Sequence, residues 1–288
     1  MCLAACGGEG ATPASPAPSD AFASGRADVG GYELAYRCQG TGSPTVVLEA
    51  GLGASGVAEL GDLLDPLSTT TRVCTYDRAG TGVSDRRPDG TGPVTAGLIA
   101  DELHELLEVI GVRPPIVIAA HSFGGMPARA FEGAYPDGVA GLVLIEVSSE
   151  PEVPIYERLD AGPWIDGSDR IDIGATVEEL HAAGDLDDLP VVVVTAERIT
   201  DRWLKTVPDA AARAQARLAG LSGDGMEVVA EGSGHFVYRT NPELVIEAIR
   251  IAVEAARSGS ALPACEEAFQ ELHATCVPRG DVPDLIPA

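Results

Sequence analysis

Short apolar runs and longer amphipathic stretches alternate along this chain. Six runs have the length and composition of β-strands, at residues 32–38, 45–49, 72–76, 115–119, 139–145 and 191–195. The first alternates apolar and polar positions and is predicted as a hairpin strand, whereas the others are short or wholly apolar and are predicted as central strands. Several of these runs stop at Gly-rich turns, which commonly mark the ends of strands.

Three stretches between or after these runs have the spacing of helices. Residues 95–110 place apolar side chains on one stripe and acids on the other face, and Gly111 ends the pattern. A second helix is predicted from Gly124 to about Tyr135, and a third begins at Asn241-Pro242, an N-cap residue followed by a first-turn proline. Strands that alternate with helices predict an α/β fold with a mostly parallel sheet.

Three segments have neither the strand period nor the helix period. Residues 7–25 are rich in Gly, Ala, Pro, Ser and Thr, which predicts a flexible tether, so residues 1–27 are assigned outside the folded domain. Residues 147–188 gain Pro, Gly and Asp and are predicted as an insertion of the lid type within a domain at 28–257. The remaining tail, 258–288, has no pattern that gives it a place in the core.

Composition and charge narrow the function classes. The 288 residues are 45% hydrophobic, enough for a substantial core, and 19 basic against 44 acidic residues give a net charge of -25. A chain so acidic repels phosphate backbones and anionic lipid headgroups, which argues against a nucleic-acid partner. No run of about 18 apolar residues is present to span a membrane.

Six cysteines are many for a cytosolic enzyme, and they fall in three sequence pairs: Cys2 and Cys6, Cys38 and Cys74, Cys265 and Cys276. None has the CxxC spacing of a zinc or redox motif, so disulfides are favoured over a metal site. Leu3-Ala4-Ala5-Cys6 resembles a bacterial lipobox, in which Cys6 would carry lipid and tether an exported protein to a membrane. The basic and apolar parts of such a signal are missing, so either the start codon lies further upstream or the match is accidental.

The sharpest chemical signal is Ala120-His121-Ser122-Phe123-Gly124, between a buried strand and a helix. A nucleophilic serine needs a tight strand-to-helix turn, because the turn lifts its Oγ out of the sheet and directs backbone N–H groups at a developing oxyanion. Small residues two before and two after the serine permit such a turn. Ala120 stands where Gly is usual.

Residues 28–255 resemble the α/β-hydrolase fold family. Besides the serine turn, Ala50-Gly51-Leu52-Gly53 is similar to the family's oxyanion turn, with Ala50 in place of His. The stretch from Tyr76 to Ser84 resembles the D-x-R-G-x-G-x-S motif, and Gly232-Ser233-Gly234-His235-Phe236 resembles the loop that delivers the catalytic histidine. The resemblance implies a mostly parallel sheet flanked by helices, with a small lid.

The same resemblance implies roles for particular residues. Ser122 is the expected nucleophile and His235 the expected general base, and the backbone amides of Leu52 and Phe123 would form the oxyanion hole. Because the second strand of this fold pairs with the fourth, Cys38 and Cys74 would be neighbours on adjacent strands and could form a disulfide. A second disulfide, between Cys265 and Cys276, would cross-link the tail locally. His121 is expected to pack, and His104, His181 and His273 receive no role.

The acid that orients His235 has three candidates. The family often places it after the seventh strand, where Glu197 and Asp201 lie near the usual position. Some members use an acid at the end of the sixth strand, where Glu146 closes an apolar run, and Glu146 is favoured because a carboxylate there is costly without a partner. Glu49 is another acid at a strand end, and it is expected to support the oxyanion loop.

The predicted function is hydrolysis of an ester-like bond in a small molecule, through an acyl-enzyme on Ser122, by an exported monomer without metal or organic cofactor. Serine rather than Asp at position 122 argues against dehalogenase or epoxide hydrolase chemistry. One alternative is a proline iminopeptidase-like or amidase activity with the same triad, in which Glu150, Glu152 or Asp160 would recognise a free amine. The other is a non-catalytic surface-binding lipoprotein on a hydrolase scaffold.

Overall fold

A computed structural model describes residues 21–158, 162–200 and 204–278. Within them one mixed sheet has the strand order β1-β2-β4-β3-β5-β6-β9-β10-β11. Its strands are β1 (Phe22–Asp28), β2 (Glu33–Gln39), β3 (Val46–Glu49), β4 (Val73–Tyr76), β5 (Ile116–His121), β6 (Val139–Ile145), β9 (Val191–Ala196), β10 (Gly225–Ala230) and β11 (Ala274–Val277).

The middle of this sheet is parallel and its two edges are antiparallel. Strands β4, β3, β5, β6, β9 and β10 run in one direction, whereas β1 with β2, β2 with β4, and β11 with β10 pair antiparallel. This is the mostly parallel α/β sheet that the sequence predicts. The carboxyl ends of the parallel strands therefore meet along one edge, where ligands commonly bind in such sheets.

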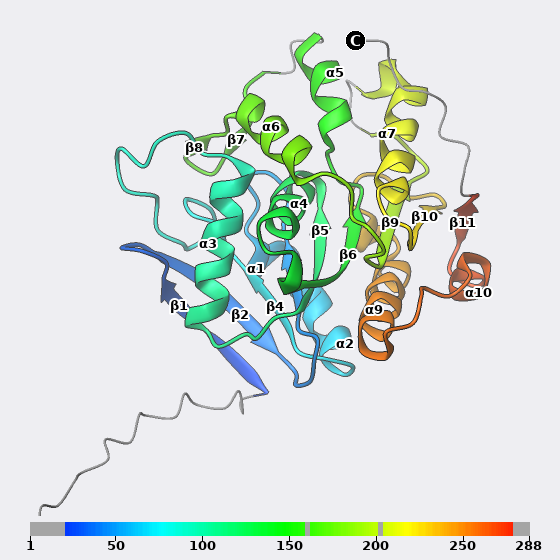
Figure 1. Cartoon of the computed structure of the whole chain (residues 1–288), viewed down its shortest axis with the longest axis horizontal. Helices are drawn as coiled ribbons and strands as arrows, with labels where there is room; N and C mark the ends of the chain where they lie inside the picture. The colour runs from blue at the N-terminus through cyan, green and yellow to red at the C-terminus, as the bar shows by residue number, and fades with distance from the viewer. Residues whose placement is uncertain (1–20, 159–161, 201–203, 279–288) are drawn as a thin grey trace, which may run out of the picture.

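Helices cover both faces of the sheet (Figure 1). One face packs against α3 (Ala96–Val109), α4 (Gly125–Ala134) and α7 (Pro208–Gly220), and the other against α2 (Leu64–Ser68), α9 (Pro242–Ser258) and α10 (Cys265–Phe269). Strand β5 supplies both cores in turn, because Ile116 and Ile118 face one helical layer and Val117 and Ala119 face the other. The short helices α1 (Gly56–Glu59) and α8 (Val237–Thr240) lie in connecting loops.

The helix ends follow the local signals of the sequence. The Thr95 side chain accepts a hydrogen bond from Leu98 N and caps α3, and Asn241 does the same for Leu244 N at the start of α9. Gly259 ends α9 in the left-handed conformation at a φ of 64°.

The insertion between β6 and β9 forms a small lid. It consists of η4 (Glu150–Glu152), α5 (Val153–Arg158), the hairpin of β7 (Ile165–Asp166) and β8 (Asp169–Arg170), and α6 (Ile173–Ala183). In Figure 1 these green elements gather at the top of the sheet. The lid thus lies at the edge where the central strands end.

Two segments differ from expectation. Residues 22–27, predicted as the last part of the segment outside the domain, form most of β1, because backbone pairing with β2 gives this polar segment a place that its composition does not signal. The tail also joins the fold, since β11 pairs with β10 and Phe269 of α10 is buried in the core. One buried aromatic residue and a strand of four residues do not produce a hydrophobic period that can be recognised in the sequence.

Both expected disulfides are formed. Cys38 and Cys74 are directly opposite each other on β2 and β4, and Cys265 of α10 is bonded to Cys276 of β11. Cys2 and Cys6 lie outside the described residues. None of the described helices is long and apolar enough to cross a membrane.

Candidate active site

Ser122 follows β5 directly, at the turn into α4. Its φ is 54°, a left-handed backbone conformation that is uncommon for a residue with a side chain. Its Oγ lies 3.0 Å from Nε2 of His235, within hydrogen-bond distance. The sequence therefore identified two residues, 113 positions apart, that the fold brings into contact.

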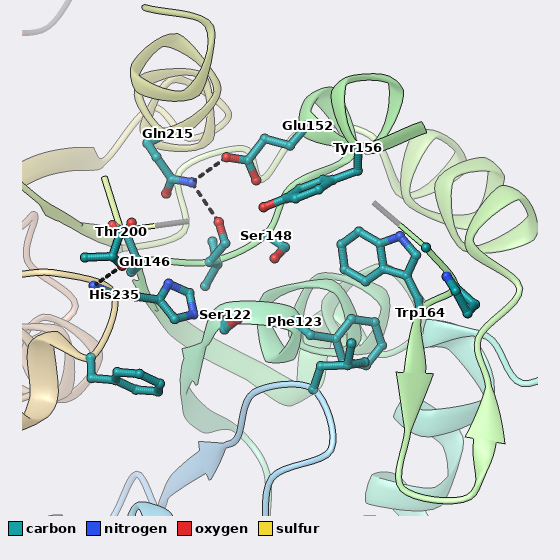
Figure 2. A pocket seen from close by; sticks show the side chains of 15 residues that line it. Ser122, Phe123, Glu146, Ser148, Glu152, Tyr156, Trp164, Thr200, Gln215 and His235 are labelled. Carbon is teal, nitrogen blue, oxygen red and sulfur yellow. Dashed lines mark hydrogen bonds between the residues drawn. The ribbon is translucent and has the colours of Figure 1, made fainter. Parts of the chain in front are cut away.

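His235 lies in the loop between β10 and α8, and its backbone is held on two sides. Its N–H donates to Oγ1 of Thr200, 3.3 Å away, and its carbonyl oxygen accepts a hydrogen bond from Nε2 of His121, 3.0 Å away. Figure 2 shows the imidazole directed toward Ser122. These contacts hold the backbone of the loop, and they leave Nε2 of the His235 ring in contact with Ser122.

His121 does more than the packing expected of it. Burial, together with the nearby His235, lowers the pKa of His121 to about 3, so its imidazole is neutral at physiological pH. A neutral ring whose Nε2 donates to the His235 carbonyl is one defined tautomer. The ring also packs edge-on against Tyr238. Its position next to the serine in the sequence did not signal the hydrogen bond, because that bond depends on a loop from a distant part of the chain.

The loop after β3, which carries Leu52, lies against the serine turn. A Cβ on Gly124 would come within 2.6 Å of the Ala50 carbonyl oxygen, and a Cβ on Gly51 within 3.3 Å of the Ser122 Cβ. Glycine at these two positions thus permits the close approach of the two turns. The residues expected to supply oxyanion amides, Leu52 and Phe123, come from these two turns, and both line the cavity described below.

Arg78 is hydrogen-bonded to the loop after β3. Its wholly buried guanidinium donates to the carbonyl oxygens of Ala50 (2.7 Å) and Gly51 (2.5 Å) and to Oε1 of Glu49 (2.5 Å). This agrees with the supporting role expected of Glu49. The guanidinium carbon also lies 5.5 Å from the centre of the Phe123 ring.

The same arginine reaches the lid. Its Nε and Nη2 donate to the two carboxylate oxygens of Asp166 in β7, at 2.7 and 2.8 Å, and Asp166 Oδ1 accepts a hydrogen bond from Gly53 N at 2.6 Å. Burial alone would raise the pKa of Asp166, but the charge and hydrogen bonds of Arg78 outweigh it and hold that pKa below its ordinary value. Arg78 belongs to a motif that the sequence displays, whereas Asp166 lies in the lid, where no pattern marked it.

Glu146, the favoured acid, directly follows β6 and has a φ of 45°. Its Oε2 accepts a hydrogen bond from Ala196 N at 2.6 Å, and its side chain lines the same cavity as Ser122 and His235. Burial raises its pKa to about 7. Among the hydrogen bonds between described residues, none joins Glu146 to His235, so its carboxyl group is fixed to the end of β9 rather than to the imidazole.

The other two candidate acids are placed differently. Glu197 is exposed, and its Oε2 accepts a hydrogen bond from Gly232 N at 2.7 Å, at the start of the His235 loop. Asp201 lies outside the described residues.

A cavity of about 370 Å³ opens above the serine. Figure 2 shows Ser122 and Phe123 at its floor, Trp164 and Tyr156 of the lid along one side, and Glu152 and Gln215 at the opposite end from the serine. Two large apolar side chains that line the cavity, Leu52 and Phe236, are 36% and 45% exposed. The cavity is large enough for a small organic substrate.

One group of described residues brings three possible metal ligands together: His104, Glu105 and Glu108 on α3, away from the serine turn in the fold. Both glutamates are exposed, and the His104 ring stacks on Tyr135 with 4.1 Å between ring centres. Exposed acids at helical spacing are common without an ion, and the stacking explains the placement of His104.

Comparison with known families and proteins agrees with this architecture. The model of the alpha/beta hydrolase fold matches residues 44–175. "Probable transporter efuK" of Hormonema carpetanum is 33% identical over 142 residues, which are 46% of this chain and 20% of that protein. A proline iminopeptidase of Saccharolobus solfataricus is 32% identical over 117 residues, 39% of this chain and 36% of that enzyme.

The alignments thus span less than two thirds of the length of these relatives. Among solved structures, E-2-(acetamidomethylene)succinate hydrolase superposes with a TM-score of 0.58 at 23% identity, over 81% of this chain and 100% of that one. A likeness at this identity concerns the fold.

Proposed function

The chain is a protein of the α/β-hydrolase fold, and we propose that it is a serine hydrolase that cleaves an ester bond of a small molecule. The observation that carries the proposal is the 3.0 Å contact between Ser122 Oγ and His235 Nε2, at a strand-to-helix turn with the serine at positive φ, beneath an open cavity. Backbone strain at a pocket residue is typical of functional sites.

In the proposed reaction His235 takes the proton of the Ser122 hydroxyl as Oγ attacks the ester carbonyl carbon. The carbonyl oxygen becomes an oxyanion, for which the amides of Leu52 and Phe123 are the proposed donors. The tetrahedral intermediate collapses to an acyl-enzyme, and the leaving alkoxide receives the proton from His235. Water, deprotonated by the same histidine, then attacks the acyl carbon. The bond from that carbon to Ser122 Oγ breaks, His235 returns the proton to Oγ, and the carboxylic acid leaves.

We propose Glu146 as the acid that supports His235. Strands β5 and β6 are neighbours with His121 opposite Ile145, so Ser122 and Glu146 follow equivalent positions at the same sheet edge. The Ala196 hydrogen bond occupies one carboxylate oxygen and leaves Oε1 for a second contact. Glu197 and Asp201 are the competing candidates, and the variants described in the Discussion separate them.

Labelling with a fluorophosphonate tests the nucleophile. The wild type should be labelled covalently and should hydrolyse short-chain p-nitrophenyl esters, whereas Ser122→Ala should lose both. Ser148→Ala removes another serine that lines the cavity and should still be labelled. Absence of label in the wild type would contradict the serine mechanism and favour a non-catalytic binding protein. Equal label in Ser122→Ala would show that the reactive residue is not Ser122.

A second candidate is an iminopeptidase or amidase activity at the same residues. The likeness to a proline iminopeptidase and the position of Glu152 in the cavity favour it. Of the other acids considered for amine recognition, Glu150 is paired with Arg129 at 3.0 Å, and Asp160 lies outside the described residues. Release of 4-nitroaniline from proline 4-nitroanilide at a rate comparable to ester cleavage would select this candidate.

We further propose that the protein is exported and acts as a monomer on a small-molecule substrate. The two disulfides support an oxidising compartment, since cytosolic thiols are kept reduced. A lipid on Cys6 would tether it to a membrane, and mass spectrometry of the membrane-bound protein purified from its native cells would detect that modification.

A further inference from the structure

The end of the cavity away from Ser122 is built from two buried polar side chains. Glu152 of η4 is 2% exposed and Gln215 of α7 is 5% exposed, and both line the cavity. Figure 2 shows them facing each other, with Ser148 between them and the serine. Polar groups this deeply buried normally have all their hydrogen bonds satisfied.

Gln215 is not fully satisfied. Its Nε2 donates to the carbonyl oxygen of Val147 at 2.7 Å and, more weakly, to Oε1 of Glu152 at 3.4 Å. Its Oε1 is buried and has no hydrogen-bond partner among the described residues. The two bonds of Nε2 fix the orientation of the amide, so its oxygen stays buried and the N–H group is the part of Gln215 that faces Glu152.

Glu152 likewise lacks a counter-charge. Its Oε2 accepts a hydrogen bond from Ser149 N at 2.9 Å, but within the described residues no arginine or lysine pairs with it. The nearby ionisable group is another acid, Glu146, and burial together with that neighbour raises the pKa of Glu152 to about 8. Glu150, two residues earlier, contrasts with it because Arg129 neutralises it.

A buried carboxyl group that lacks a counter-charge and lines the cavity is complementary to a group that is positively charged and donates hydrogen bonds. We propose that Glu152 and Gln215 form a subsite for a primary ammonium group carried by the substrate. The ammonium donates to the Glu152 carboxylate. Glu152 gives up its proton to solvent as the ammonium binds, because the positive charge lowers the pKa of this buried carboxyl group. The edge-to-face pair of Tyr156 and Trp164, 5.4 Å between ring centres, forms an apolar side wall for the chain that joins the ammonium to the scissile carbonyl.

This inference rests on the proposed serine hydrolase function and names its substrate class. It is tested with matched esters: p-nitrophenyl 6-aminohexanoate and p-nitrophenyl heptanoate, in which a methyl replaces the ammonium. The measured quantity is the ratio of kcat/KM for the amino ester to that for the heptanoate. We expect a ratio of about ten or more in the wild type, because a hydrogen-bonded charge in a buried site discriminates at least that strongly.

Glu152→Gln keeps the shape of the side chain but cannot carry the negative charge, and it should lower the ratio by about tenfold. Gln215→Met removes the amide that donates to Glu152 and should lower the ratio in the same direction, which provides a second readout if one variant does not fold. Glu157→Gln, an exposed acid on α5, is the matched control and should leave the ratio unchanged.

Three results would overturn the subsite: a wild-type ratio near one, a ratio unaffected by both pocket variants, or equal preference for the 6-hydroxyhexanoate ester. Each of these leaves ester hydrolysis itself intact. If instead no ester is cleaved and Ser122 is not labelled, the proposed function fails, and calorimetry with hexylamine decides the subsite alone. Binding by the wild type and tenfold weaker binding by Glu152→Gln would support it, whereas no binding would overturn it.

Discussion

Ser122 and Glu146 share an uncommon backbone conformation. Each is the first residue after a central strand, and their φ angles are 54° and 45°. For residues with a Cβ this left-handed conformation costs on the order of 1 kcal/mol or more, so the surrounding structure must hold it in place. Both side chains line one cavity, and the shared backbone geometry at adjacent strand ends is the reason that they do.

The identity of the supporting acid is decided by three conservative variants. If Glu146 orients His235, Glu146→Gln should lower kcat for a p-nitrophenyl ester by on the order of 10³-fold, since an amide cannot stabilise the imidazolium. Glu197→Gln and Asp201→Asn should then stay within about threefold of the wild type. A large loss in Asp201→Asn with near-normal turnover in Glu146→Gln would transfer the role to Asp201.

Buried acids in the cavity also predict how stability depends on pH. The folded protein keeps the proton on Glu152 up to about pH 8, whereas the unfolded chain releases it near the ordinary value of 4.5. The folded state binds more protons between these values, so this contribution to the free energy of unfolding is complete below pH 4.5 and is lost as pH rises through 8.

Thermal unfolding between pH 5 and 9 measures this effect. The Tm of the wild type should fall over this range, and Glu152→Gln should reduce the fall because its amide does not ionise. Glu146→Gln should also reduce the fall in Tm, mostly below pH 7, where the Glu146 carboxyl group titrates. Glu157→Gln serves as the control, and the same Tm slope in Glu152→Gln and in this control would contradict the assignment.

Among the secondary-structure elements, Arg78 is the link between the end of β4, the oxyanion loop and the lid hairpin. Its guanidinium holds two carbonyl groups of the loop, while Asp166 of β7 holds the amide of Gly53. The amide of Leu52 lies between these two attachment points. We therefore predict that Arg78 and Asp166 are positioning residues, which act on the proposed reaction through the loop that they fix.

The two acids of the lid hairpin make a matched experiment. Asp166 pairs with Arg78 under the oxyanion loop, whereas Asp169 of β8 pairs with Arg87 at 2.7 Å, on the side of α3. Asp166→Asn should lower kcat by about 10- to 100-fold with little change in KM, because a displaced oxyanion donor weakens the transition state more than the bound substrate.

Asp169→Asn should keep kcat within about twofold. Circular dichroism must accompany the assay, since breaking a buried ion pair costs about 3 to 5 kcal/mol and could unfold part of the sample. Equal kcat losses in the two variants would show that the lid, rather than the loop, responds to the substitution.

Elements with a clear period could be predicted from the sequence, and those stabilised only by distant partners could not. The apolar stripe of residues 95–110 corresponds to α3 (Ala96–Val109), and the apolar runs correspond to the central strands. Ser122 and His235 were found because each lies in a short local motif. The pairing of Asp166 with Arg78 joins residues 88 positions apart, one of them in a lid without periodicity, and no local pattern could reveal it.

At the scale of the whole molecule, the two disulfides fasten opposite edges of the sheet. Cys38–Cys74 joins β2 to β4 near the amino-terminal edge, and Cys265–Cys276 joins α10 to the last strand, β11. The turns that carry Ser122 and His235 follow β5 and β10, which lie between these edges. The disulfides should therefore stabilise the fold without taking part in the reaction.

Their separate contributions can be predicted from the chain that each one closes. The two sequence separations are 36 and 11 residues, for which unfolded-state entropy gives about 4 kcal/mol for Cys38–Cys74 and about 3 kcal/mol for Cys265–Cys276. The double variants Cys38→Ala/Cys74→Ala and Cys265→Ala/Cys276→Ala should both have a lower free energy of unfolding in urea than the wild type, and the loss should be larger in the first. The kcat of both variants at 25 °C should stay near that of the wild type. A smaller loss in the first variant than in the second would mean that strain in the folded sheet, rather than loop entropy, sets the effect. The loss of kcat in a variant that is still folded would instead show that the edge strands hold the active-site turns in position.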